Sequence, residues 1–568
     1  MRRIFAGTKV TAQGCVLVPM VFVLAGCASM DVDLTEQSLP EIPERWAGAE
    51  KIDTDGADMA AVEDRAGLNA TIDEINDIPT GDWVGSFGDD ALHGLIAEAM
   101  VHNNNLQAAV RNLAAARSNV KVTRSALFPT LNADGSAGRI AAVGNPLIAA
   151  QAGGGNGDLA GLDASDLEDQ FGVDRDGDGR LDGLDFDGDG FAEAQLPDRR
   201  IYINSYQLQA RINWELDVWG RIRDETKAAY GDATATLADL DGARLSVASS
   251  VAQAWFNLIE ARLQRELADR TFEARQSNLR ITERRYERGV ASSLDVRLSR
   301  SQVASDQSNL LLRRQQEAEA SRRLEVLLGR YPGAEIEAAS RLPELPSLEG
   351  AGAPGDVLAR RPDILAAEAR MEAAGLRARA ARKQLLPQLS ISANVNTSGP
   401  VLADVIDPER LAGNLFSSIA QPIFQGGRLR ANAKRAKAQA EAAIFTYTQT
   451  ALAAYEEAEN ALAAEVFLAG REAALKLAYE EAAAGEALTE RRYNSGAASI
   501  FNLLDAQTRR IAAESQYINA QSQRVRNRVQ LYLAIGGNFI TDPGLFAEPQ
   551  TVSQLSPSDR TRGIPDAP

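Results

Sequence analysis

The stretch Tyr206-Gln-Leu-Gln-Ala-Arg-Ile-Asn-Trp-Glu-Leu216 alternates apolar and polar side chains without a break. A period of two residues predicts a β-strand with one apolar and one polar face. After Gly220 the period lengthens, and apolar residues recur at helical spacing until Tyr286 and Gly289. A helix over about residues 221–285 would extend roughly 95 Å at 1.5 Å per residue, about three times the thickness of a bilayer core. The strand therefore leads into a helix that must form part of the wall of an elongated structure.

A second copy of this pattern follows later in the chain. The glycines and tyrosines that mark it recur at one constant offset of 207 positions. The matched pairs are Gly220 and Gly427, Tyr286 and Tyr493, and Gly289 and Gly496. Before the strands the offset is 258, as Pro129 and Pro387 show, which places about 51 extra residues between Pro129 and Gly220. We therefore predict one architecture doubled in tandem, rather than several unrelated domains.

Three further segments alternate in the same way, at about Leu131–Ala137, Leu389–Val395 and Leu415–Phe424. Alternation over this length is typical of membrane barrel strands, which face lipid on one side and a wet lumen on the other. The alternative is a soluble sheet whose apolar face lies in a core. Four strands cannot close a barrel with a wet interior, whereas three copies would supply twelve. The predicted fold class is mainly α-helical with a transmembrane β-barrel: a trimeric α-barrel tunnel of long coiled-coil hairpins plus a 12-stranded β-barrel.

The N-terminus has the features of a secretory signal: a basic start, an apolar run over residues 15–24, and small residues before Cys27. The ending Leu24-Ala25-Gly26-Cys27 resembles the bacterial lipobox, in which the cysteine becomes the lipidated first residue. The alternative is a plain signal peptide with an incidental cysteine. If Cys27 is acylated, the mature chain keeps no free cysteine, which excludes disulfides and thiolate metal sites.

The formal net charge of -18 argues against a nucleic-acid partner. Catalysis is also not expected, because His93 and His102 are the only histidines and no nucleophile has a matching context. Arg360 and Arg361, before Pro362, are expected to form structural ion pairs at a helix junction. The domains that we expect are a signal peptide (1–26), a lipidated tether (27–82), a first repeat (83–340) with an acidic insert at about 140–198, a connector (341–355), a second repeat (356–540) and a disordered tail (541–568).

Motifs along both repeats resemble the outer membrane factor family, the TolC-like and NodT-type channel lipoproteins. They include Trp83, Phe87 and Asp89, the run Ala359-Arg-Arg-Pro-Asp-Ile364, the segments Tyr286-Glu-Arg-Gly289 and Tyr493-Asn-Ser-Gly496, and Leu503-Leu-Asp-Ala-Gln507. The resemblance covers nearly all of the mature chain outside the insert. It implies a homotrimer in the outer membrane, lipid-anchored, with its tunnel in the periplasm. It also implies docking to a periplasmic adaptor protein and an inner-membrane transporter, most typically of the resistance-nodulation-division type.

The resemblance assigns roles to the hairpin tips. Tyr286, Gly289, Tyr493 and Gly496 match the tips that contact the adaptor, although both glycines could equally be turn residues only. An apolar ring and an acidic ring close the periplasmic mouth in the family, and Phe501 and Asp505 occupy the matching positions, one helical turn apart.

Three converging Asp505 carboxylates would repel anions and each other, so that neighbouring helices must hold the mouth closed. Asn502 departs from members that have a further acid here, which leaves a single acidic ring. The alternative is that Asp505 is an exposed charge on a coiled-coil surface.

The insert carries 13 acidic residues between Asp158 and Glu193. Twelve residues within it match an EF-hand-type calcium loop, with acids at positions 1, 3, 5, 9 and 12, a glycine at 6 and a carbonyl at 7. The ligands would be Asp174, Asp176, Asp178, the carbonyl of Arg180, Asp182 and Asp185. A second, partial loop includes Asp187, Asp189 and Glu193. The alternative is a solvated acidic loop without a metal.

The function that we predict is a passive export duct: the outer-membrane channel of a tripartite efflux or secretion system, opened at its periplasmic tip, without a catalytic cofactor. Ca²⁺ in the insert and a covalent lipid on Cys27 are the expected non-protein groups. The rival prediction is a calcium-stabilised structural or adhesive surface lipoprotein whose coiled coils act as a spacer. The exported substrate cannot be inferred from the sequence.

Overall fold

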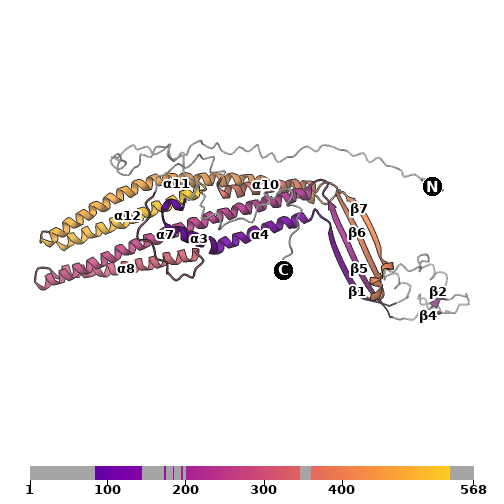
Figure 1. Ribbon diagram of the computed structural model, residues 1–568, viewed down its shortest axis with the longest axis horizontal. Coiled ribbons are helices and arrows are strands. Elements are labelled where there is room, and N and C mark those ends of the chain that lie inside the picture. Colours follow the sequence, from indigo (N-terminus) through magenta and orange to yellow (C-terminus); the bar gives the residue numbers. More distant parts are fainter. Residues whose placement is uncertain are drawn as a thin grey trace, which may run out of the picture. The chain divides into compact units, whose positions relative to one another are not determined.

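The computed structural model describes residues 83–143, 172–173, 183–184, 194–195, 200–345 and 360–537. Within them, an antiparallel sheet alternates along the chain with long helices that pair as hairpins (Figure 1). Cys27 and all of the predicted calcium ligands lie outside the described residues.

The main sheet has four strands in the order β1-β5-β6-β7, all antiparallel. Their bounds are Thr130–Val143 (β1), Arg200–Leu216 (β5), Gln388–Gly399 (β6) and Ala412–Ala420 (β7). The four-stranded prediction is confirmed. The position of the fourth strand was wrong by a few residues, because β7 ends before Pro422, which has no amide hydrogen to extend a ladder.

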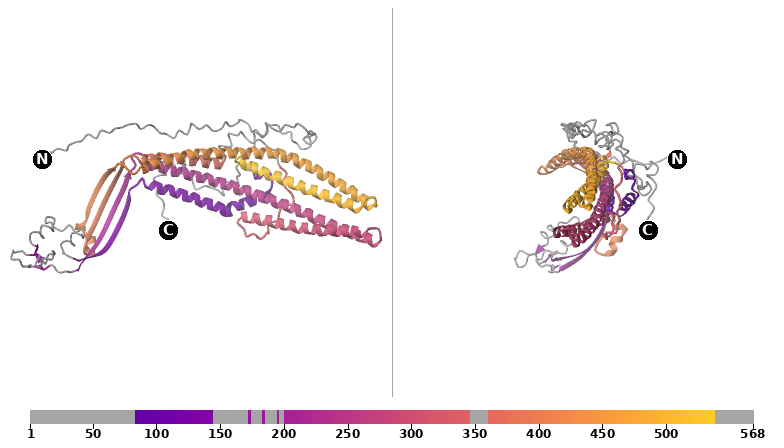
Figure 2. Two further views of the ribbon diagram at one scale, coloured as in Figure 1. Left: turned by 180° about the vertical axis from the view of Figure 1, so that it is seen from behind. Right: turned by 90° about the vertical axis from the view of Figure 1, so that its left-hand side faces the viewer.

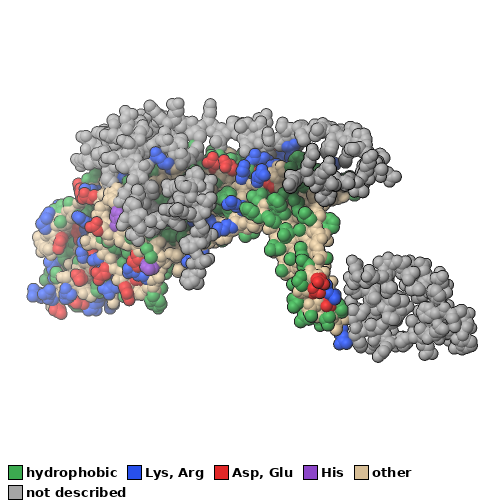
Figure 3. Space-filling view, turned by 45° about the vertical axis from the view of Figure 1, so that its right-hand side comes forward, with side chains coloured by type: hydrophobic (Ala, Val, Ile, Leu, Met, Phe, Trp, Pro, Cys, Tyr) green, Lys and Arg blue, Asp and Glu red, His purple; other side chains and the backbone are tan. Residues whose placement is uncertain are grey.

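The apolar face of this sheet is uncovered within the chain. Leu208 on β5 is 46% exposed, and Leu415 and Ile419 on β7 are each 73% exposed. Hydrophobic side chains dominate the visible surface of the sheet, whereas charged side chains crowd the helices (Figure 3). A soluble sheet would bury this face in a core, so the exposure favours the membrane interpretation.

The helices repeat with the offsets that the sequence predicts. α7 (Arg221–Glu287) and α11 (Arg428–Asn494) have 67 residues each, and α8 (Ser293–Leu327) and α12 (Ile500–Ala534) have 35. Both pairs begin and end 207 positions apart. α4 (Asn104–Ser125) and α10 (Pro362–Lys383) have 22 residues each, at an offset of 258. The tandem repeat is therefore confirmed at the level of whole helices.

Apolar residues recur at helical spacing from Ala91 to Ala126 and predict one continuous helix. The structure instead has two helices there, α3 (Asp90–His102) and α4. Asn103 lies between them in an extended conformation, and its Oδ1 accepts hydrogen bonds from the backbone N–H groups of Asn105 and Leu106. Its Nδ2 donates to the carbonyl of Leu327, at 2.8 Å. The break lets α3 turn towards the core while α4 follows the long helix.

The junctions between strand and helix are built alike in both repeats. The Nε1 of Trp214 donates to the carbonyl of Leu127, and the Nε2 of Gln421, 207 positions later, donates to the carbonyl of Leu385, both at 3.0 Å. Each long helix then starts after a glycine with positive φ, 74° at Gly220 and 83° at Gly427. Glycine accepts this left-handed conformation without the steric cost of a Cβ atom.

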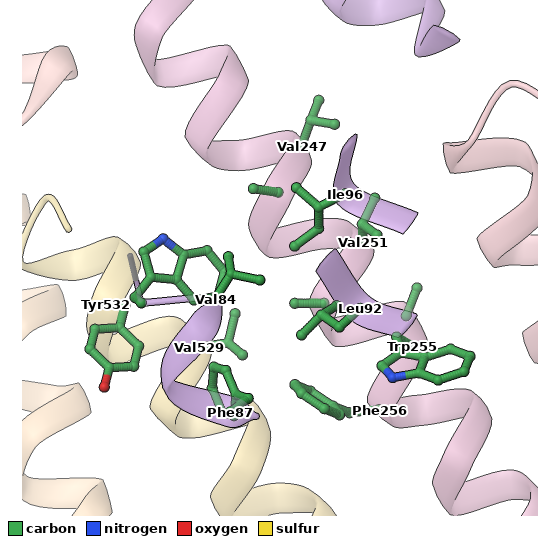
Figure 4. Packing of buried hydrophobic residues seen from close by; sticks show 14 of the residues in the cluster. Val84, Phe87, Leu92, Ile96, Val247, Val251, Trp255, Phe256, Val529 and Tyr532 are labelled. Carbon is green, nitrogen blue, oxygen red and sulfur yellow. The ribbon is translucent and has the colours of Figure 1, made fainter. Parts of the chain in front are cut away.

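The main hydrophobic core lies where α3, α7, α8 and α12 meet. A short 3₁₀ helix, η1 (Gly85–Phe87), inserts Phe87 there. Trp83, just before η1, stacks on Tyr532 with ring centroids 5.8 Å apart. Phe87 packs against Phe256 of α7 at 5.2 Å (Figure 4). The core therefore joins the N-terminal segment of the first repeat to the last helix of the second.

From this core the hairpins α7–α8 and α11–α12 run side by side to their tips (Figure 2). Two short 3₁₀ helices, η2 (Leu402–Ile406) and η3 (Pro408–Arg410), connect β6 and β7. In the insert, β2 (Gly172–Val173), β3 (Gly183–Leu184) and β4 (Ala194–Gln195) form a small antiparallel sheet. Among the described residues, every helix is too short or too polar to cross a membrane.

Candidate functional site: the hairpin tips

Each tip reverses through the same glycine turn. At the first tip, Gly289 has φ of 73°, and the N–H of Val290 donates to the carbonyl of Arg285 at 2.8 Å. At the second tip, Gly496 has φ of 77°, and Ala497 donates to the carbonyl of Arg492 at the same distance. These bonds satisfy the terminal carbonyls of α7 and α11. The predicted glycines are thus the turn residues of both hairpins.

The helices that leave the two turns are capped differently. Ser292 and Asp295 form a reciprocal capping box at the start of α8, with bonds of 3.2 and 2.8 Å. At the start of α12, Ser499 accepts from the N–H of Asn502 at 3.4 Å, and the helix has no acid in its first turn. Asn502 thus replaces an acid that would complete the capping box.

The paired tyrosines differ in exposure. Tyr286 is 49% exposed at the first tip, whereas Tyr493 is 9% exposed at the second. Tyr493 packs with Ile500 and Leu503, and the guanidinium of Arg285 lies 4.6 Å from its ring centroid. The second tip is therefore fastened to the first by a cation–π contact.

Phe501 and Asp505 lie one turn apart at the start of α12. The side chain of Phe501 is 68% exposed. Asp505 accepts a hydrogen bond from Arg509 at 2.8 Å, and this pairing raises the pKa of Arg509. The acidic position therefore carries its own counter-charge in the single chain, which sequence analysis missed although the spacing of four residues on one helix could have revealed it.

A buried arginine joins the two hairpins behind the tips. The side chain of Arg275 on α7 is 3% exposed, and Asp306 of α8 lies 3.4 Å from its Nε. On the side of α12 it donates to Gln507 and, at 3.3 Å, to Thr508. Burial lowers its pKa, and the charge of Asp306 opposes that shift. Removing either partner would leave a charge in a poorly hydrated place.

Metal coordination finds no support in the described part of the chain, where no three His, Cys, Asp or Glu side chains gather in a suitable group. Near the hairpin bases, Arg361 forms the ion pairs that were expected of this junction, with Asp363 and Glu457, both at 2.8 Å. It also donates to the carbonyl of Ala534. This arginine holds the start of α10 against α11 and α12.

Comparison with known proteins places these features in one family. The family model for outer membrane efflux proteins matches residues 184–330 and 353–537. The pyoverdine export outer membrane protein OpmQ of Pseudomonas putida is 30% identical over 344 residues, which are 60% of this chain and 72% of that protein. The probable efflux pump outer membrane protein TtgC of Pseudomonas putida is 26% identical over 536 residues, 93% of this chain and 96% of that protein.

Solved structures agree with this result. The outer-membrane channel OprN superposes with a TM-score of 0.67 at 25% identity, over 83% of this chain and 96% of that one. The chain thus shares both sequence and fold with outer-membrane channels over most of its length.

Proposed function

This chain belongs to the outer membrane efflux protein family and is an outer-membrane efflux channel, and from that premise we propose how it forms and controls its duct. Three copies would combine their sheets into a 12-stranded barrel and their hairpins into a periplasmic tunnel. The observation that carries this proposal is the open sheet: β1 and β7 each pair on one side only among the described strands. An unpaired strand edge in lipid is strongly unfavourable, so the edges must meet in neighbouring copies.

The direct test is single-channel recording with purified protein in planar bilayers, together with its mass in detergent. We expect discrete conductance steps from a species with the mass of three chains. A species with the mass of one chain that carries no current would refute the duct and would favour the rival surface spacer. The measurement also separates a passive duct from an enzyme, because conductance requires no turnover.

We propose that the periplasmic end closes at Phe501 and Asp505. The exposure of Phe501 and the helical spacing of the two residues support this role. Asp505→Ala would leave the Arg509 guanidinium groups of the three copies without their carboxylate partners. These cations would then repel one another at the mouth and raise the resting conductance. Glu490→Ala, an exposed acid on α11, is the control that should leave the leak unchanged. An unchanged leak in Asp505→Ala trimers would count against this gate.

The tips are also the proposed contacts for a periplasmic adaptor, itself bound to an inner-membrane transporter of the resistance-nodulation-division type. Tyr286, Gly289 and Gly496 are exposed and would be accessible to it. Tyr493 is buried under Arg285 and would act by holding the second tip. Tyr286→Ala should therefore abolish cross-linking to the adaptor without changing conductance, whereas Tyr493→Ala should alter conductance as well.

We further propose that Cys27 is lipidated and that the insert binds calcium through its Asp174–Asp185 loop. In support, β2 and β3 pair Val173 with Gly183, which places the residue before Asp174 beside a residue between Asp182 and Asp185. Calcium should slow proteolysis of the insert in the full-length protein, and Asp174→Asn/Asp178→Asn should abolish the protection. Cleavage that does not respond to calcium or chelator would exclude the metal.

A further inference from the structure

The internal repeat allows the contact between neighbouring copies to be inferred from the contact between the two repeats within one chain. In the single chain, α7 of the first repeat packs against α10 and α12 of the second repeat. α11 corresponds to α7 at the offset of 207. Because α4 and α8 correspond to α10 and α12, the equivalent neighbours of α11 would be α4 and α8. Within the chain, α11 packs against α10 and α12 of its own repeat, just as α7 packs against α4 and α8 of its own repeat. In a closed ring of copies, α4 and α8 of the next copy can occupy the vacant side of α11.

Ion pairs run along the boundary within the chain, in addition to the apolar core described above. Lys383 of α10 bonds Asp224 of α7 at 2.6 Å, and Arg270 of α7 bonds Glu514 of α12 at 2.8 Å. On α10, Arg377 pairs with Asp232 of α7 and Arg370 pairs with Asp239 of α7. On α12, Arg526 pairs with Glu260 of α7. Charged contacts therefore recur along this boundary, from the base of α7 to beyond its middle.

The corresponding residues of the other boundary follow from the two offsets. Adding 207 to each α7 residue gives the α11 position, subtracting 207 from each α12 residue gives the α8 position, and subtracting 258 from each α10 residue gives the α4 position. Lys383 and Asp224 correspond to Ser125 and Ala431, and Arg270 and Glu514 correspond to Leu477 and Gln307. The counterparts of the three pairs formed by Arg377, Arg370 and Arg526 are Asn119 and Gln439, Asn112 and Thr446, and Glu319 and Phe467. None of these five pairs joins opposite charges, so the ionic chemistry is lost at all five places.

Large apolar side chains appear there instead, and they are exposed in the single chain. Phe467 on α11 is 65% exposed, and Leu312 on α8 is 48% exposed. They correspond to Glu260 and Asn519, which are joined within the chain by a hydrogen bond of 2.9 Å. An apolar pair thus replaces a polar contact in the same geometry.

A neighbouring residue shows the same change in burial. Leu311 on α8 is 59% exposed, whereas its counterpart Ile518 on α12 is 7% exposed. Ile518 shows that this helical position is buried when the neighbouring helix is present. The exposure of Leu311 marks the place where such a neighbour is still missing.

We propose that α11 of one copy docks on α4 and α8 of a second copy through this surface, which lacks the ion pairs of the boundary within the chain, with Phe467 against Leu312. The proposal rests on the trimeric duct proposed above and specifies which faces meet. It also assigns different chemistry to the two boundaries: ion pairs add to the apolar core between the two halves of one chain, whereas apolar contacts without these ion pairs join the copies. Salt should weaken the first boundary more than the second, because screening acts on charges.

The test is thiol cross-linking of the full-length protein. Both native cysteines lie within the first 27 residues of the sequence. Phe467→Cys/Leu312→Cys, treated with a short bismaleimide, should give covalent dimers and trimers on denaturing gels. The matched control is Glu260→Cys/Asn519→Cys, which should cross-link within a chain and give only monomers of altered mobility. Each single cysteine variant should give neither product and controls for Cys27.

The outcomes separate this inference from the duct itself. Multimers from the control pair, with none from Phe467→Cys/Leu312→Cys in protein of trimeric mass, would overturn the assigned faces and leave the duct intact. A monomeric mass in detergent would instead refute the trimer. As a second measurement, Phe467→Asp should lower the trimer fraction at least tenfold at a fixed protein concentration. Phe467→Leu should preserve it, and equal loss in both variants would contradict apolar docking.

Discussion

The two helical hairpins have the same helix lengths and the same glycine turns, but their interiors differ. α7 buries Trp255, Phe256, Leu258 and Ile259, whereas the matching residues of α11 are Leu462, Ala463, Glu465 and Val466. One hairpin is anchored by an aromatic and aliphatic core, and the other by a buried ion pair. Equal backbone geometry has therefore been stabilised in two different ways, which leaves the second hairpin more dependent on charges.

The largest expected effect comes from removing the aromatic anchor of the first hairpin. Phe256→Ala converts this position to the residue of its counterpart, Ala463, and should cost about 3–5 kcal/mol of unfolding free energy because a cavity remains. Urea unfolding followed by circular dichroism measures it. Tyr331→Ala, which truncates a side chain that is 89% exposed, is the control. A small loss at Phe256 would mean that both hairpins tolerate the same interior.

The second prediction concerns the buried ion pair of the second hairpin. Arg528 bonds Glu465 at 2.7 Å, and their side chains are only 1% and 3% exposed. Glu465→Leu should destabilise the protein by about 3–5 kcal/mol, because a buried cation loses its carboxylate. Glu465→Leu/Arg528→Ser imports the first hairpin's residues, Leu258 and Ser321, and should recover most of that loss in the same unfolding assay. Failure to recover would show that the two interiors are not interchangeable.

A third prediction separates the ends of the two hairpins by pH. Burial alone would raise the pKa of Glu325, but backbone N–H donors from Ala334 and Glu335 hold it below its ordinary value of 4.5. A carboxylate with a depressed pKa stabilises the fold above its unfolded-state pKa, and this contribution disappears as the pH falls through the lower folded-state value. The counterpart in the second repeat is Tyr532, whose side chain has no carboxylate.

Thermal unfolding between pH 7 and pH 3 should therefore show less acid sensitivity in Glu325→Gln than in the parent. At neutral pH the same variant should be the less stable of the two, because the ionised acceptor is gone. Glu337→Gln, an exposed acid nearby, should behave like the parent at both ends of the range. Parallel pH curves for Glu325→Gln and the parent would remove Glu325 as the source.

The smallest effect belongs to a charge pair that is reversed between the hairpins. Arg265 bonds Glu317 at 2.7 Å in the first, and Glu472 bonds Arg524 at 2.9 Å at the equivalent place in the second. These side chains are about a quarter exposed, so Arg265→Glu should cost about 1 kcal/mol at most from the lost pair. Arg265→Glu/Glu317→Arg should restore it in a double-mutant cycle, whereas no coupling would show that orientation is irrelevant.

The repeat, the four strands and the long helices could be predicted because each depends on local periodicity and on a constant offset. The break at Asn103 could not, since both sides of it have helical patterns and the asparagine is fixed by a carbonyl from a distant helix. The turn glycines of the tips were found from sequence for the same local reason. The burial of Tyr493 was missed, because it depends on Arg285 from the other hairpin.

The 67-residue length shared by α7 and α11 constrains how such a protein can change over evolutionary time. A deletion of seven residues would shorten one helix by roughly 10 Å. In the trimer proposed above, a deletion confined to one repeat would shorten three of the six hairpins around the periplasmic mouth and leave an uneven surface for the proposed adaptor. α7 and α11 can therefore change length only by the same number of residues, so that the duplication couples length changes in one repeat to length changes in the other.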